Sequence, residues 1–258
     1  MERNKQIAAM AENEEERLLL VRTCEKLERG REREVPVSTA FLTPREQSLV
    51  KKLLPWCGFF GGTDGTQRNV AFYLPDYLTA EELFSDDVIS CIRATFYENN
   101  ALTHRDVLGA LMGLGIRRDA VGDILVGDRF AVIFVLEELS RYLLDNLTSA
   151  GRHHLKTERI DPSTVVIPPL KLREIHVTVS SLRLDSVLSA SFHLSRAEAA
   201  DAIRSGQAAI HALTCLKPDA AVREGDDLSL RGRGKLRILQ VQGRTRKDRI
   251  ALNVGIFE

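Results

Sequence analysis

The chain has 258 residues, a formal net charge of zero and a hydrophobic content of 44%, so it is long enough for two or three small domains with cores of their own. No apolar run approaches the roughly 20 residues that span a bilayer. The N-terminus has no apolar signal core followed by a small-residue cleavage site. We therefore expect a cytoplasmic protein that is neither secreted nor membrane-spanning.

The four cysteines are far apart and form no CxxC pair; they are Cys24, Cys57, Cys91 and Cys215. Buried, reduced thiols are the expected state of such scattered cysteines, in place of a zinc site or a disulfide framework. The sequence therefore predicts no bound metal and no cofactor.

Charge is unevenly distributed along the chain. From Leu172 to the end there are 14 Lys and Arg against 10 Asp and Glu. Eight basic residues and one acid fall within 231–249. Such a concentration creates a local positive potential even in a neutral chain, which points to an anionic partner for the C-terminal part.

The first segment, 1–85, is predicted to be a mostly helical domain. Three glutamates precede the apolar run Leu18–Val21, as at the start of a helix. Thr43 and Glu46 have the spacing of a capping box, and Pro44 suits the first helical position between them. The glycines of 58–65 favour a hairpin turn over a phosphate-binding loop, because no GK[ST] follows. A strand over 69–74 is expected to end the domain.

The second segment, 86–161, has the element order of a split β-α-β fold. Thr103 and Asp106 cap a helix, and Gly127-Asp128 joins two apolar runs as a hairpin turn does. The predicted elements, in order, are a strand at 88–96, a helix at 103–114, strands at 123–126 and 130–135, a helix at 136–147 and a strand at 153–160. This β-α-β-β-α-β order predicts a ferredoxin-like, RRM-like domain. The aromatic signature of RNA-recognition motifs is absent; Phe130 and Phe134 are its nearest counterparts, and either core packing or base stacking accounts for them.

A proline-rich stretch at 162–172 is predicted to be a stiff linker to the third domain, 173–258. That domain should open with a strand over 173–179 and a helix over 182–190. Ser195 and Glu198 form a second capping box, and Gly206 ends that second helix. Further strands are predicted at 208–210, 228–230 and 236–241. The whole chain is thus expected to be an α+β protein.

The turn Arg231-Gly232-Arg233-Gly234-Lys235 combines charge with a backbone that approaches ligands closely. Arg237 shares a strand face with Lys235 because side chains two residues apart point the same way. Arg244, Arg246, Lys247 and Arg249 either extend this basic surface or keep a turn soluble. The sequence leaves that choice open.

The third domain resembles the S-four RNA-binding domain in the order and spacing of about 55 residues. The matching residues are Arg183-Leu184-Asp185, Leu188, Ser195-Arg196, Ala199, Ile203, Gly206, Pro218, Val222, Gly225-Asp226 and Arg231-Gly232. One departure is His211, which stands where the family usually has Asn, and it puts the local turn and an RNA contact in question.

The S-four resemblance implies an RNA-binding face formed by two helices and the neighbouring strand. The residues it assigns to RNA binding are Arg183, Asp185, Ser195, Arg196, Arg204, His211, Arg231, Arg233, Lys235 and Arg237. Asp185 is expected to orient Arg183 or cap locally. Arg196 stands in the first turn of a helix, where a cation opposes the dipole, so a phosphate contact is favoured over idle solvation.

The stretch Leu102–Ile116, together with Gly122–Leu125, resembles the middle domain of the YlmH family of bacterial S-four-domain RNA-binding proteins. The resemblance spans nearly the whole chain and is weakest over the first 80 residues. It implies a ribosome-associated factor acting on the large subunit, linked to rescue of stalled nascent chains and to cell division. His104, Arg105, Arg117 and Arg118 are candidates for a second RNA surface.

Three functional hypotheses follow. The first is a non-catalytic factor that binds folded rRNA or tRNA on the ribosome. The alternative is an RNA-modifying enzyme of the pseudouridine-synthase kind, which would use the S-four domain to bind substrate. This alternative is disfavoured because such enzymes usually carry the catalytic domain after the S-four domain, and no catalytic domain is expected there. The third is an adaptor whose first two domains dock a protein partner, which is compatible with the first.

Overall fold

The computed structural model describes residues 2–80, 88–97, 102–167, 172–245 and 248–257. The chain divides into two compact units, 1–168 and 169–258, each described by itself. The predicted boundary at 85/86, the prolines at 168 and 169, and the basic residues Arg246 and Lys247 lie outside the described residues.

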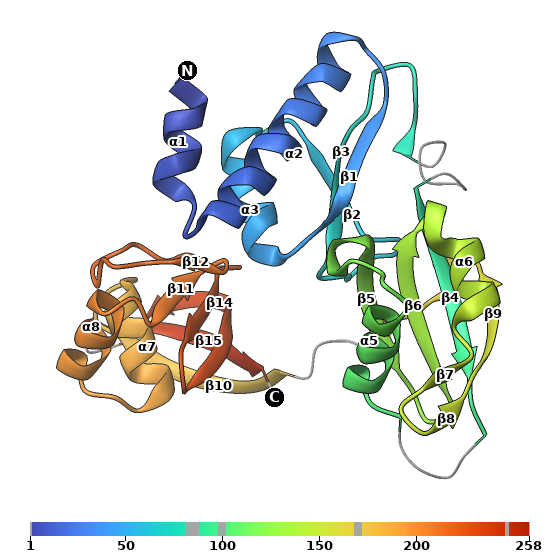
Figure 1. Cartoon of the computed structure of the whole chain (residues 1–258). Helices are drawn as coiled ribbons and strands as arrows, with labels where there is room; N and C mark the ends of the chain where they lie inside the picture. Colours follow the sequence, from blue (N-terminus) through green and yellow to red (C-terminus); the bar gives the residue numbers. More distant parts are fainter. Residues whose placement is uncertain (1, 81–87, 98–101, 168–171, 246–247, 258) are drawn as a thin grey trace. The chain divides into compact units, whose positions relative to one another are not determined.

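Three helices and a small sheet make up the start of the first unit (Figure 1). The elements are α1 (Glu2–Met10), α2 (Glu14–Glu32), β1 (Val37–Leu42), α3 (Pro44–Leu53), β2 (Gly58–Phe60) and β3 (Asn69–Tyr73). The strands form an antiparallel sheet of order β1-β3-β2. The predicted capping box is present, with the Thr43 side chain accepting from the Glu46 N–H. The sequence predicted one of these strands, so the segment has more sheet than the expected mostly helical domain.

The second part of the first unit is a four-stranded antiparallel sheet with two helices. Its elements are β4 (Ile89–Thr95), α5 (His104–Gly113), β5 (Val121–Val126), β6 (Phe130–Leu136), α6 (Ser140–Asn146) and β9 (Lys156–Ile160). A small hairpin, β7 (Ser149–Ala150) and β8 (His153–His154), precedes β9, and short 3-10 turns lie at Arg118–Ala120 and Glu137–Leu139. The strand order is β5-β6-β4-β9, so β6 lies between β4 and β5. The element order is the β-α-β-β-α-β order that the sequence predicts.

Both faces of this sheet are covered by apolar side chains. On one face, Ile92 and Ile133 pack with Val107 and Leu111 of α5 and with Leu143 of α6. The other face meets the N-terminal segment in a second cluster that contains Phe41, Val70, Val132 and Phe134. Phe134 is therefore a core residue, whereas Phe130 at the start of β6 is 40% exposed.

The first part of the predicted linker packs on the first unit. A short 3-10 turn spans Pro162–Thr164, and Val165 is buried in the cluster around Phe134. The Thr63 hydroxyl donates to the Val165 carbonyl at 3.3 Å. Residues 162–167 therefore pack on the first unit, whereas the sequence predicted that they belong to a free, stiff linker over 162–172.

The second unit is a six-stranded antiparallel sheet with two helices along one side (Figure 1). Its elements are β10 (Leu172–Val179), α7 (Leu184–Phe192), α8 (Arg196–Arg204), β11 (Ala208–Ile210), β12 (Leu213–Thr214), β13 (Asp227–Leu230), β14 (Gly234–Arg244) and β15 (Ile250–Phe257). The strand order is β10-β15-β14-β13-β11-β12. Strands β12 and β15 were not predicted from the sequence.

The helices pack on the apolar face of this sheet. Val187 and Leu188 of α7 and Ile203 of α8 share a core with Leu236 and Ile238 of β14. Side chains alternate along a strand, so Lys235 and Arg237 lie on the opposite face of the sheet, away from the helices.

Candidate nucleic-acid interface

A buried carboxylate holds two arginines at the start of the helix pair. Asp185 in the first turn of α7 is 5% exposed. Its Oδ1 accepts from Arg183 Nε at 3.2 Å, and its Oδ2 accepts from a terminal nitrogen of Arg183 and of Arg196, each at 3.0 Å. Asp185 therefore orients both guanidinium groups, as the sequence analysis expected for Arg183.

The electrostatics of this cluster leave one net positive charge. Burial raises the pKa of Asp185, but hydrogen bonds from Arg183 and Arg196 outweigh it and hold the pKa below its usual value. The carboxylate is thus ionised at neutral pH. The two arginine side chains remain 43% and 49% exposed, so each still presents N–H donors to an anion from solution.

The local fold brings these residues together through two features. The N–H groups of Leu184 and Asp185 donate to the carbonyls of Ala220 and Pro218, both at 2.9 Å, so a loop far along the chain anchors the start of α7. Ser195 caps α8 by accepting from the Glu198 N–H at 3.1 Å. That cap fixes Arg196, whose guanidinium also donates to the Ser180 hydroxyl at 3.1 Å.

Arg204, in the last turn of α8, forms an exposed pair with Asp201 at 2.8 Å. A cation at this end of a helix interacts favourably with the dipole. The two side chains are 62% and 75% exposed, so the pair is worth little in stability and leaves Arg204 available to a partner.

Lys235 and Arg237 form a second, separate group on the outer face of the sheet. Arg237 makes two hydrogen bonds to Asp227, at 2.7 and 3.0 Å, and Lys235 Nζ is 3.1 Å from the same carboxylate. Burial raises the pKa of Asp227, but hydrogen bonds from Arg237 and Lys235 outweigh it and hold the pKa below its usual value. Both cations also lie over the Phe257 ring, at 4.5 and 5.7 Å. Of the ten predicted residues, Lys235 and Arg237 thus lie on the sheet face opposite the α7–α8 pair.

His211 occupies the two-residue turn between β11 and β12. His211 and Ala212 both have positive φ, 49° and 63°, as a type I′ hairpin turn requires. Asn is favoured at such a position because its short side chain tolerates a left-handed backbone. His211 adopts the same conformation, with Nε2 2.9 Å from Asp226 Oδ1. The departure from the family pattern therefore leaves this turn in place.

Arg231 and Arg233 lie on the turn between β13 and β14. Gly232 and Gly234 have φ values of 78° and 121°, which side chains rarely adopt. The Arg231 N–H donates to the Gln207 carbonyl at 2.8 Å, so the turn is tied to the end of α8. Both arginine side chains are exposed.

The four residues of the predicted second RNA surface do not form one cluster. His104 and Arg105 are exposed in the first turn of α5, while Arg117 and Arg118 follow its other end. Ten helical residues separate the pairs by ~15 Å at 1.5 Å per residue. Arg117 is paired with Asp119. Burial lowers the pKa of Arg118, whose guanidinium donates to the Val121 carbonyl at 2.6 Å, so Arg118 supports the backbone.

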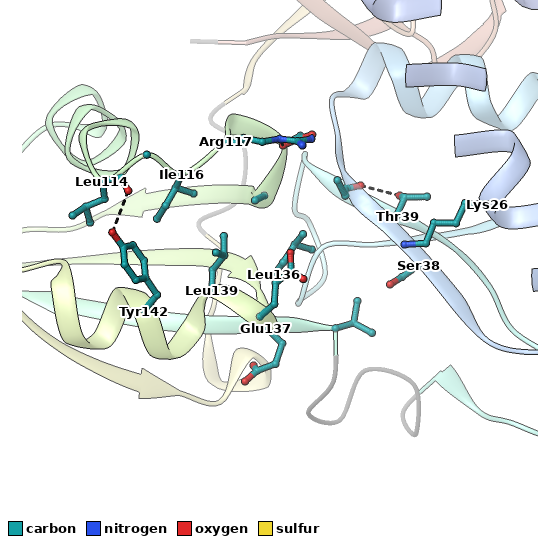
Figure 2. A pocket seen from close by; sticks show the side chains of 16 residues that line it. Lys26, Ser38, Thr39, Leu114, Ile116, Arg117, Leu136, Glu137, Leu139 and Tyr142 are labelled. Carbon is teal, nitrogen blue, oxygen red and sulfur yellow. Dashed lines mark hydrogen bonds and ion pairs between the residues drawn. The ribbon is translucent and has the colours of Figure 1, made fainter. Parts of the chain in front are cut away.

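A cavity of about 680 Å³ in the first unit lies beside Arg117. Figure 2 shows Lys26, Ser38 and Thr39 of the N-terminal segment on one side of it, and Leu114 and Tyr142 on the other. Tyr142 Oη donates to the Leu114 carbonyl at 3.2 Å. Arg117 is the one residue of the predicted sites among those lining this cavity.

The described residues contain no group of three or more His, Cys, Asp or Glu side chains placed to hold a metal ion. Within the same ranges, no helix is both long and apolar enough to cross a bilayer. Cys24, Cys57 and Cys91 are buried free thiols, and Cys215 is half-buried.

Sequence reasoning missed several partners of the candidate residues. Ser180 and Phe257 were not singled out, although each contacts predicted basic residues. The alternation of apolar residues over 250–257 was a usable signal for β15, and with it for Phe257. The contact between Asp185 and Arg196 had no such signal, because the packing of α7 on α8 creates it.

The fold and the site define an α+β protein with arginines held in fixed positions by carboxylates. A family model described as "Putative RNA-binding domain in YlmH" matches residues 94–164. The "Ribosome-associated protein quality control protein P2" of Bacillus subtilis (strain 168) is 32% identical over 216 residues, which cover 82% of this chain and 83% of that protein. The chain belongs to the YlmH family, as its sequence resemblance predicted.

A solved structure is also similar, the "Cell division protein ylmH from Streptococcus pneumoniae". It is 28% identical, covers 58% of this chain and 93% of its own, and superposes with a TM-score of 0.48.

Proposed function

We propose that this protein is a non-catalytic RNA-binding factor of the ribosome, which contacts folded rRNA or tRNA on the large subunit. The observation that carries the proposal is the pair of half-exposed guanidiniums of Arg183 and Arg196, held by the buried Asp185. Pre-oriented arginines suit phosphate oxygens because less side-chain freedom is lost on binding. The RNA-binding description of the matched family model and the name of the Bacillus subtilis relative support the same role.

The observed topology supports the proposed architecture. The strand order β5-β6-β4-β9 favours the assignment of residues 86–161 to a ferredoxin-like, RRM-like domain. We assign residues 173–258 to an S-four domain, whose α7–α8 pair would present the first RNA face. Arg231 and Arg233 would extend binding beyond that pair, and His104 and Arg105 remain candidates on the first unit. Roles in rescue of stalled nascent chains and in cell division belong to the same proposal, and ribosome association would place the protein in the cytoplasm.

An orienting role for Asp185 supports the non-catalytic assignment. The triplet Arg183-Leu184-Asp185 is similar to the Arg-Leu-Asp of a pseudouridine synthase. Here both carboxylate oxygens of Asp185 accept hydrogen bonds from arginines, and the side chain is 7% exposed. A carboxylate that attacks a base must instead reach the substrate.

Cosedimentation with large ribosomal subunits tests the proposal. We expect Arg183→Glu with Arg196→Glu to weaken binding more than about tenfold, and the slope of log affinity against log salt to fall by about 1.5–2 as two phosphate contacts are lost. A control with the same charge change, Arg17→Glu with Arg141→Glu, alters exposed pairs on the first unit and should bind nearly as the unaltered protein does. Equal binding by both double variants would refute the assigned face.

A further inference from the structure

A hollow in the second unit is lined by residues from four separate segments. Its volume is about 210 Å³, several times the ~30 Å³ that a water molecule occupies in the liquid. It lies between the start of β10, the end of α7, the turn after β13 and the end of β15. The lining residues are Arg173, Ile175, Ser191, Phe192, His193, Arg233 and Ile256.

The hollow carries positive charge that no ion pair neutralises among the described residues. Arg173 and Arg233 are exposed, and neither guanidinium has a carboxylate within ion-pair distance among the described residues. Five other arginines of this unit are paired with carboxylates: Arg183, Arg196, Arg204, Arg237 and Arg244. No Asp or Glu lines the hollow.

Glu198 is an acidic residue near enough to Arg233 for the two charges to interact. Hydrogen bonds from Ser195 lower the pKa of Glu198, and the charge of Arg233 adds to this. The Glu198 carboxylate forms part of the cap of α8, because its Oε2 accepts a hydrogen bond from the Ser195 N–H at 2.8 Å. The negative pole at the C-terminus of α7 opposes an anion weakly, and two full positive charges outweigh it.

Ser191 supplies a second, independent indication of a ligand. The residue is 2% exposed, and its hydroxyl is buried without a hydrogen-bond partner among the described residues. A buried hydroxyl that makes no hydrogen bond costs free energy. An anion in the hollow would accept from this hydroxyl and remove that cost.

We propose that this hollow binds a phosphate group through Arg173 and Arg233, with the Ser191 hydroxyl as a further donor and the His193 ring in the wall. Arginine suits this ligand because its planar fork of N–H groups matches two phosphate oxygens at once. The phosphate is either a free or terminal phosphate or part of an RNA backbone. The RNA source rests on the proposed function; the binding of phosphate itself does not.

Inorganic phosphate tests the site directly on the full chain. We expect phosphate, added at constant ionic strength, to shift the side-chain Nε NMR signals of Arg173 and Arg233 in a saturable way. Ser191→Ala should weaken that response without loss of the fold by circular dichroism, because the hydroxyl it removes has no partner. The absence of a saturable shift at both arginines would overturn the proposal.

A second arm identifies the source of the phosphate. Binding to large ribosomal subunits is compared for Arg173→Gln with Arg233→Gln and for a control, Lys217→Gln with Arg223→Gln, which removes the same charge from exposed residues elsewhere in the unit. A loss of about tenfold for the first double variant only, with a salt slope lower by about 1–2, assigns the site to an RNA phosphate. Equal binding, with the NMR shift present, assigns it to a free or terminal phosphate. If the unaltered protein does not bind the subunit, the proposed function fails while the NMR arm still decides the site.

Discussion

Replacing Asp185 by Asn removes the charge that orients the two arginines and keeps the size of the side chain. Hydrogen bonds to charged groups contribute ~1.5–3 kcal/mol when buried. The arginine partners are 43% and 49% exposed, so they regain water once the carboxylate is lost. We therefore expect the second unit to lose about 1–2 kcal/mol of unfolding free energy at neutral pH.

The pH dependence of this loss has a defined sign. The folded pKa of Asp185 is lowered, and an unfolded aspartate titrates near ~3.9. The stabilisation by its charge is therefore present above ~3.9 and is lost as the pH falls through the folded value. The difference between Asp185→Asn and the unaltered protein should be largest at neutral pH and should shrink below about pH 4.

Urea denaturation with two probes measures the effect on the full chain. The single tryptophan, Trp56, and all four tyrosines lie in the first unit, so Trp56 fluorescence follows that unit, while circular dichroism follows both. Asp185→Asn should move the circular dichroism transition and leave the fluorescence transition unchanged. Asp201→Asn, in an exposed pair of the same unit, serves as the control, with an expected change within about 0.5 kcal/mol. The reasoning is refuted if the two variants behave alike, or if the loss is the same at acid and neutral pH.

Three further outcomes are expected. Burial raises the pKa of Cys91 to about 12. A thiol reagent at pH 8 should therefore label the half-buried Cys215 and spare Cys91 until the protein unfolds, which mass spectrometry would detect. The free energy of unfolding should also fall above pH ~8.5, because the thiol ionises there in the unfolded chain but not in the folded one. His211→Val should cost about 1–2 kcal/mol by circular dichroism, because a β-branched residue resists a φ of 49°, whereas His211→Asn should cost nothing measurable. Gly62→Ala places a Cβ 2.6 Å from the Phe134 ring at a φ of 105°, so the free energy of unfolding of the first unit should fall by at least about 2 kcal/mol. The Trp56 fluorescence transition should then move to lower urea; an unchanged transition would contradict this packing.

Local signals in the sequence predicted the helix starts well. The spacings of Thr43 with Glu46, Thr103 with Asp106 and Ser195 with Glu198 all correspond to capping boxes in the structure. These features depend on residues three apart, so they can be read without knowledge of the fold. The split β-α-β order followed in the same way from hydrophobic periodicity and turn residues.

Features that depend on contacts between distant segments were not predictable. The pairing of β14 with β15 places Phe257 on the same sheet face as Lys235 and Arg237. Because β15 was not predicted from the sequence, this group was not predicted either. Arg118 looked like an exposed basic residue, yet the fold half-buries it and its guanidinium donates to backbone carbonyls. For Arg183 and Arg196 the sequence suggested the location, but the shared carboxylate appears only once α7 packs on α8.

Crosslinking the full chain to RNA in cells, followed by sequencing of the RNA and mapping of the crosslinked peptides, tests the central claim most directly. We predict large-subunit rRNA or tRNA as the enriched species, with crosslinks in the peptides that carry Arg183 and Arg196. Enrichment of other RNA classes, or crosslinks to ribosomal RNA confined to the first unit, would contradict the assignment of RNA binding to the α7–α8 face.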